Sequence, residues 1–97
     1  MTIIVCQAIG CTAPRKSSQF MCLPHWKALP LILRQQINRT WGAWRAAEGD
    51  ARRLRWVDYI EARDEARRWT ADGEGRLGQF EPDAPRIRRS YEREARS

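Results

Sequence analysis

The sequence predicts a mainly α-helical protein with a metal-binding module at its N-terminal end. Three cysteines and the only histidine of the 97-residue chain lie between residues 6 and 25. Two later stretches, residues 30–48 and 50–72, carry apolar side chains at helical spacing. Residues 73–97 are rich in glycine, proline and arginine. They predict a loop and a basic tail. The length suits a single domain, residues 1–97, with the metal module in residues 1–29.

The candidate metal ligands form two pairs, Cys6 with Cys11 and Cys22 with His25. Three thiolates and one imidazole are a donor set of structural zinc, and they fill all four tetrahedral positions. Gly10 can supply the positive φ of a tight turn before Cys11. The i, i+3 spacing of Cys22 and His25 places both side chains on one face of a helix. A knuckle, a loop and a helix with the last ligands is the layout of a treble-clef finger, so we expect one structural Zn²⁺.

Other roles for the cysteines stay open. A free cysteine is often a small buried hydrophobe, and redox-active or nucleophilic thiols are further alternatives. An odd number of cysteines argues against a closed set of disulfides.

The helix predicted over 30–48 starts at Pro30, a residue that is tolerated in the first helical turn. Its apolar stripe consists of Leu33, Ile37, Trp41 and Trp44. Gly49 is expected to end this helix and to join it to the next one in an αα-hairpin.

The helix predicted over 50–72 has a broad apolar face. We expect its buried residues to be Leu54, Val57, Ala62, Ala66 and Trp69. Trp56 and Ile60 fall off this face, which would suit a helix contacted on two sides. In the basic tail, a short helix is expected from Pro85, with Asp83 as its cap.

The cysteine motif lies within a longer sequence pattern that resembles a known group of proteins. Gly10-Cys11, Met21-Cys22-Leu23-Pro24-His25-Trp26, Leu29-Pro30 and Leu33-Arg34 resemble the core of small uncharacterised zinc-finger proteins of tailed bacteriophages and prophages. The resemblance covers residues 1–47 and implies zinc binding and a phage-type origin. The motif is also similar to treble-clef fingers found beside HNH nucleases, but the chain has no His-Asn-His pattern.

Positive charge is concentrated at the two ends of the chain. The formal net charge is +6, and residues 1–48 hold six bases and one acid. Arginine and lysine neutralise phosphates, so we expect binding of DNA or RNA. Tryptophans can stack on bases, but in so small a chain we expect the five mainly in the core. The candidate nucleic-acid contacts are Arg15, Lys16, Lys27, Arg34, Arg39, Arg86, Arg88 and Arg89.

The alternative function is a protein-binding phage accessory factor, which docks on and inhibits a host complex such as a defence system or a polymerase. Its predicted interface is Trp56, Tyr59 and Ile60, which could also close a homodimer. No catalytic constellation is present, so we expect neither an enzyme nor a small-molecule substrate. No apolar run reaches the roughly 20 residues of a membrane helix. We therefore expect no membrane partner and a location in the cytoplasm of a bacterial host cell.

Overall fold

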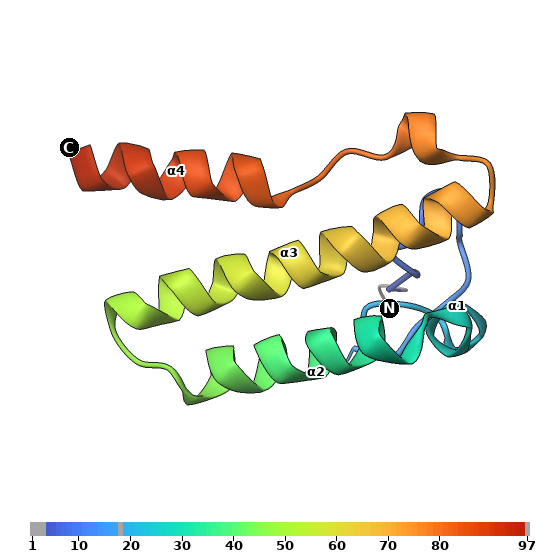
Figure 1. Cartoon of the computed structure of the whole chain (residues 1–97), viewed down its shortest axis with the longest axis horizontal. Coiled ribbons are helices and arrows are strands. Elements are labelled where there is room, and N and C mark those ends of the chain that lie inside the picture. The colour runs from blue at the N-terminus through green and yellow to red at the C-terminus, as the bar shows by residue number, and fades with distance from the viewer. Residues whose placement is uncertain (1–3, 18, 97) are drawn as a thin grey trace.

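The computed structural model describes residues 4–17 and 19–96, and these are mainly helical, as predicted (Figure 1). Four α-helices follow one another along the chain. A 3-10 turn, Leu77–Gln79, precedes the last of them. The α-helices are α1 (Leu23–Ala28), α2 (Leu31–Ala46), α3 (Asp50–Gly73) and α4 (Ala84–Arg96). None of the helices in the described residues is long and apolar enough to cross a membrane.

Helices α2 and α3 form the predicted antiparallel hairpin, with α3 in the middle of the molecule and α4 on its other side (Figure 1). The chain reverses at Gly49, whose φ of 61° lies in the left-handed region that favours glycine. Pro30 precedes the first residue of α2, so its missing N–H leaves no helical hydrogen bond unmade.

The core lies where α2 and α3 meet the N-terminal segment. Leu33 and Ile37 of α2 are buried, and Met21 and Ala66 are fully enclosed. Cys6 and Cys22 belong to the same buried cluster. The candidate metal ligands are therefore continuous with the hydrophobic core, and the hairpin supports them from one side.

The buried face of α3 agrees with the predicted one at Val57, Ala62 and Ala66 and differs from it at both ends. Leu54 is 63% exposed and Trp69 44% exposed, whereas Tyr59 and Ile60 are only 9% and 3% exposed. Trp56 is half-buried and packs against Tyr59, with ring centroids 5.5 Å apart. The prediction that Trp56, Tyr59 and Ile60 form an exposed interface is therefore wrong for Tyr59 and Ile60, which are buried, and only Trp56 keeps part of its surface exposed. Because α3 is contacted by α2, by α4 and by the N-terminal segment, its buried surface is wider than one stripe.

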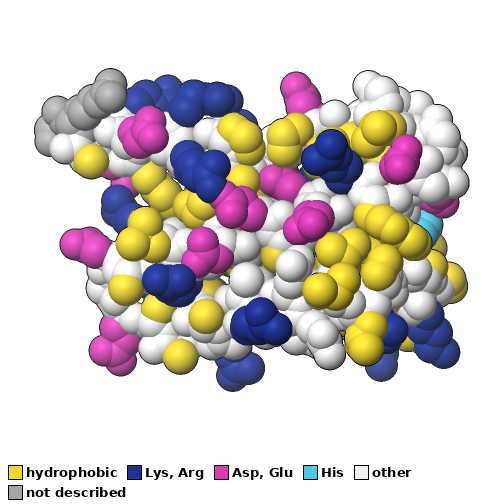
Figure 2. All heavy atoms as spheres, in the orientation of Figure 1, with side chains coloured by type: hydrophobic (Ala, Val, Ile, Leu, Met, Phe, Trp, Pro, Cys, Tyr) yellow, Lys and Arg dark blue, Asp and Glu magenta, His cyan; other side chains and the backbone are white. Residues whose placement is uncertain are grey.

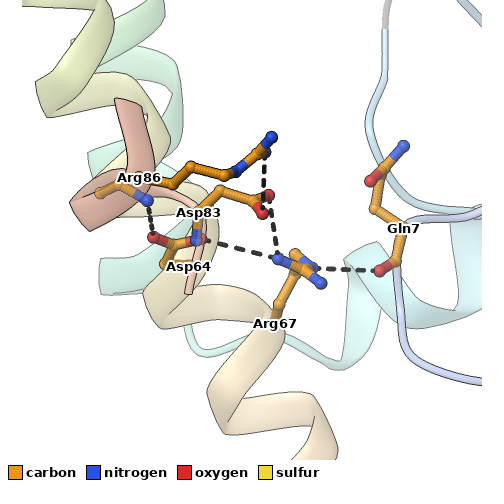
Figure 3. A network of polar contacts seen from close by, with 6 residues as sticks. Gln7, Asp64, Arg67, Asp83 and Arg86 are labelled. Atoms are coloured by element: carbon orange, nitrogen blue, oxygen red, sulfur yellow. Dashed lines mark hydrogen bonds and ion pairs between the residues drawn. The ribbon is translucent and has the colours of Figure 1, made fainter. Parts of the chain in front are cut away.

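The tail is a 13-residue helix, α4, and a buried carboxylate of α3 caps it. Asp64 accepts hydrogen bonds from the backbone N–H groups of Asp83 (3.0 Å) and Ala84 (2.9 Å). Arg67 lies beside both acids and also donates to the backbone carbonyl of Gln7 (Figure 3). The predicted capping side chain, that of Asp83, instead pairs with Arg67 and Arg86. One polar network thus joins α3, α4 and the N-terminal segment.

Candidate metal centre and basic surface

The four predicted ligands come together. One donor atom from each of Cys6, Cys11, Cys22 and His25 lies within 4.8 Å of all the others, and the three cysteines are free thiols. Two ligand atoms on one tetrahedral zinc ion lie roughly 3.5–4 Å apart, given zinc bonds of about 2.0–2.3 Å. The cluster is therefore compatible with a single metal ion, which would need only small movements of the donors.

Local backbone contacts explain why the first two ligands converge. Gly10 has a φ of 77°, and the N–H of Cys11 donates to the carbonyl of Ala8 (3.1 Å), which closes a tight turn. The N–H of Ala8 donates to the Cys6 sulfur (3.4 Å). An N–H group aimed at a sulfur stabilises the thiolate form that a metal requires. The tight turn thus brings the side chains of Cys6 and Cys11 toward each other.

The second pair of ligands belongs to α1. Cys22 occupies the N-cap position, and its carbonyl accepts a hydrogen bond from Trp26 N–H (2.9 Å). Pro24 lies in the first turn, where it costs no helical hydrogen bond. His25 then places its Nδ1 atom 3.1 Å from the Cys22 sulfur and 3.5 Å from the Cys6 sulfur. The short helix thus turns both donors toward the first pair.

Glu74, which the sequence did not point to, holds the other nitrogen of the histidine. Its Oε2 atom lies 3.2 Å from His25 Nε2, and it follows the C-terminal residue of α3. A carboxylate on the outer nitrogen of a metal-binding histidine fixes its orientation and tautomer and raises its basicity. If a metal ion were bound to His25 Nδ1, Glu74 would hold the ring from its other nitrogen in this way. No short-range pattern reveals it, because 49 residues separate it from His25.

Burial and hydrogen bonds shift the pKa values of three cluster residues in different directions. Burial raises the pKa of the Cys6 thiol to about 11. Burial also acts to raise the pKa of Cys22, but its hydrogen bonds with His25, Cys6 and Cys11 together lower the pKa overall. For His25, burial acts to lower the pKa, but the hydrogen bonds to Glu74 and Cys22 raise it overall. A bound metal must displace these protons, so metal affinity is coupled to proton release.

The predicted phosphate contacts of the finger are not equally available. Lys16, Lys27 and Arg39 are exposed. Arg15 instead donates to the backbone carbonyls of Val5 (2.8 Å), Lys16 (3.3 Å) and Gln19. Much of its guanidinium thus holds together the loop between Cys11 and Phe20, which we call the finger loop. Arg34 is half-buried, and its Nε has no hydrogen-bond partner among the described residues.

The tail cations lie on α4, on the side of α3 away from α1 and α2 (Figure 1). Arg86 is 3.5 Å from Asp83, and Arg88 pairs with Glu61 of α3. Arg89 is exposed, with no ion pair to a described residue. The structure therefore does not bring the two predicted basic groups together on one surface.

Comparison of the chain with protein-family models, with curated proteins and with solved structures gives no match. The resemblance to phage finger proteins therefore stays a prediction.

Proposed function

We propose that this chain is a zinc-stabilised nucleic-acid-binding protein. In this proposal, a treble-clef-like finger with one structural Zn²⁺ presents Lys16, Lys27 and Arg39 to the phosphate backbone. The observation that carries it is the distribution of ion pairs. All the pairs between arginine and carboxylate in the described residues lie between residues 53 and 94.

Up to residue 47, the N-terminal half of the chain has no acid that could neutralise its own cations. Its first carboxylate is Glu48, after six lysines and arginines. Figure 2 agrees for the face it shows: acidic and basic side chains alternate over α3 and α4, whereas basic side chains toward the lower right edge have no acid beside them. Unpaired surface cations attract a polyanion and release its counterions. The finger side is thus the more suitable side for phosphate.

The zinc assignment is supported by the donor chemistry. Three free thiols and one imidazole select a borderline-soft ion with tetrahedral preference. Because four protein donors leave no open position, the metal would be structural. Two features match a treble clef: a knuckle with Cys6 and Cys11, and a helix, α1, that carries His25.

Metal analysis is the first test. We expect one zinc per chain by mass spectrometry of the intact protein under native conditions, and cobalt in its place should give the absorption spectrum of a tetrahedral thiolate site. Cys22→Ser should lower the affinity sharply. A protein that is fully folded without metal and has no affinity for zinc or cobalt would contradict the zinc assignment.

The nucleic-acid role is tested by fluorescence anisotropy with labelled DNA and RNA over a salt series. The logarithm of the affinity should fall linearly with the logarithm of salt concentration. A triple variant, Lys16→Ala, Lys27→Ala, Arg39→Ala, should lose about one unit of that slope for each contact removed. The matched control is Arg86→Ala, Arg88→Ala, because these arginines are already paired with acids. Absence of binding at low salt, or equal losses in the two variants, would refute the proposal.

The alternative function is docking on a host complex. Two residues of the interface predicted for it, Tyr59 and Ile60, are buried and cannot contact a partner directly. The bacteriophage setting, and with it a host-takeover or anti-defence role, rests on the sequence resemblance.

A further inference from the structure

A cleft of about 520 Å³ opens between α1, α2, α3 and the finger loop. A volume of this order suits a ligand of the size of a nucleotide. Aromatic rings and arginines make up most of its lining. The rings are Phe20, Trp26, Trp41, Trp56 and Tyr59, and the arginines are Arg15 and Arg63.

The aromatic wall keeps ring surface accessible. The sequence led us to expect the tryptophans mainly in the core, but all five lie in the described residues and none is fully buried. Trp41 is 39% exposed and packs against Tyr59, with ring centroids 5.1 Å apart. Tyr59 in turn packs against Trp56. Rings held by their neighbours lose little conformational entropy when a planar ligand stacks on them.

Arg63 is a cation of the cleft without an ion-pair partner in the described residues. The carboxylate of Asp83, which pairs with Arg67 and Arg86, acts on the charge of Arg63 only from a distance. The guanidinium of Arg63 lies over the rings of Phe20 (5.7 Å) and Tyr59 (5.6 Å). Its Nε is buried without a hydrogen-bond partner, and no carboxylate of the described residues forms an ion pair with it. Burial lowers the pKa of Arg63, because its charge is poorly hydrated there. An anion in the cleft would supply the missing partner.

Arg15 adds a second positive charge to the same cleft. Backbone carbonyls hold its Nε and one terminal nitrogen, while its other terminal nitrogen donates to no described residue. Its charge also lowers the pKa of Arg63, so the two guanidiniums act on each other. The cleft thus holds two positive charges beside accessible rings, and no described acid is among its lining residues. This combination suits a planar anion.

We propose that this cleft binds one nucleotide unit, with the base stacked on Trp41 and Trp56 and the phosphate on Arg63 and Arg15. The inference rests on the proposed function and sharpens it, because a base can enter the cleft only when it is unstacked. The preferred ligand is therefore single-stranded nucleic acid, or a free nucleotide. Asn38 and Gln19 also line the cleft and offer amide groups to the base edge.

The test uses the zinc-loaded full chain labelled with nitrogen-15. Its tryptophan indole N–H resonances are followed while oligothymidylate, thymidine monophosphate or a DNA duplex is added. We expect the resonances of Trp41 and Trp56 to shift with the single strand more than with the duplex. Trp69 is an internal control, because it lies outside this cleft. Shifts with the mononucleotide would show that a single unit suffices, and shifts with the oligonucleotide alone would show that the site needs a strand. Both outcomes support the proposal.

Two variants identify the anion contact. Arg63→Gln should weaken single-strand binding about tenfold or more, the usual effect of losing a hydrogen bond to a charged group. Its control, Arg68→Gln, changes an exposed arginine on the same helix outside the cleft. Because Arg63 also packs on rings, Asn38→Asp is the second variant. It puts a negative charge at an exposed position in the cleft, should leave folding intact, and should weaken binding as well.

Specific results would overturn the inference. If both variants bind single strands like the unchanged protein, with the usual salt dependence, the cleft assignment fails while the phosphate-binding function stands. If no nucleic acid binds at low salt, both fail. If indole-3-acetate shifts the cleft resonances in an Arg63-dependent manner and nucleotides do not, the ligand class is wrong.

Discussion

The carboxylate of Asp64, in α3, accepts a hydrogen bond from the backbone N–H of Ala84, the first residue of α4, across 2.9 Å. A helix cap normally comes from the residue just before the helix. Here it comes from a neighbouring helix, 20 residues earlier in the chain. The cap therefore also docks α4 on α3, and Arg67 extends the contact to the N-terminal segment (Figure 3).

Removal of this cap should loosen α4. Asp64→Ala leaves the first N–H groups of α4 without their acceptor, and we expect a loss of about 1–3 kcal/mol in the free energy of unfolding. Asp64→Asn keeps one oxygen acceptor and should lose less. Urea denaturation of the zinc-loaded protein measures the loss, and amide exchange locates it in α4. Glu65→Ala, at the exposed neighbouring position, is the control. Equal losses at both positions would contradict the capping role.

Removal of the partner of His25 should weaken metal binding without removing a ligand. We expect Glu74→Ala to lower zinc affinity by about 10- to 100-fold, the range for outer-shell carboxylates. Competition with a chromophoric chelator at fixed pH measures this change. Glu81→Ala, an exposed acid elsewhere on the surface, should leave the affinity unchanged. An unaltered affinity in Glu74→Ala would mean that the contact with His25 is incidental.

Withdrawal of metal should act on the N-terminal segment first. Residues 4–29 contain all four candidate ligands and have few helical hydrogen bonds, so metal binding should contribute much of their folding free energy. With a strong chelator, we expect amide exchange to accelerate there before it does in the middle of α2 and α3. Cys22→Ser should show the same pattern without chelator. An exchange profile that does not respond to the chelator would defeat this prediction.

The buried face of α3 can be tested with two truncations. Ile60→Ala removes a side chain that is 3% exposed, and we expect it to cost about 2–5 kcal/mol of the free energy of unfolding. Leu54→Ala, at a position 63% exposed, should change stability by at most about 0.5 kcal/mol. Denaturation of the two variants under identical conditions compares the costs. A larger loss for Leu54→Ala would restore the stripe predicted from helical periodicity.

Features that depend on near neighbours could be predicted from the sequence. Three such features follow from spacing or backbone conformation within a few residues. They are the two ligand pairs with the turn at Gly10, the start of α2 after Pro30, and the chain reversal at Gly49. The mainly helical class follows from the same local periodicity. The distribution of charge can also be predicted from the sequence, because the scarcity of acids before Glu48 is visible there.

Features that join distant residues could not be predicted in this way. The position of α3 between two helices determines that Ile60 is buried and Leu54 is not. The contacts of Glu74 with His25 and of Asp64 with Ala84 bridge 49 and 20 residues. The cleft that contains Arg63 arises where the finger loop, α1, α2 and α3 meet. The local sequence pattern specifies which conformation a segment adopts. The partner of a side chain depends instead on how the segments pack, and helical spacing carries no information about this packing.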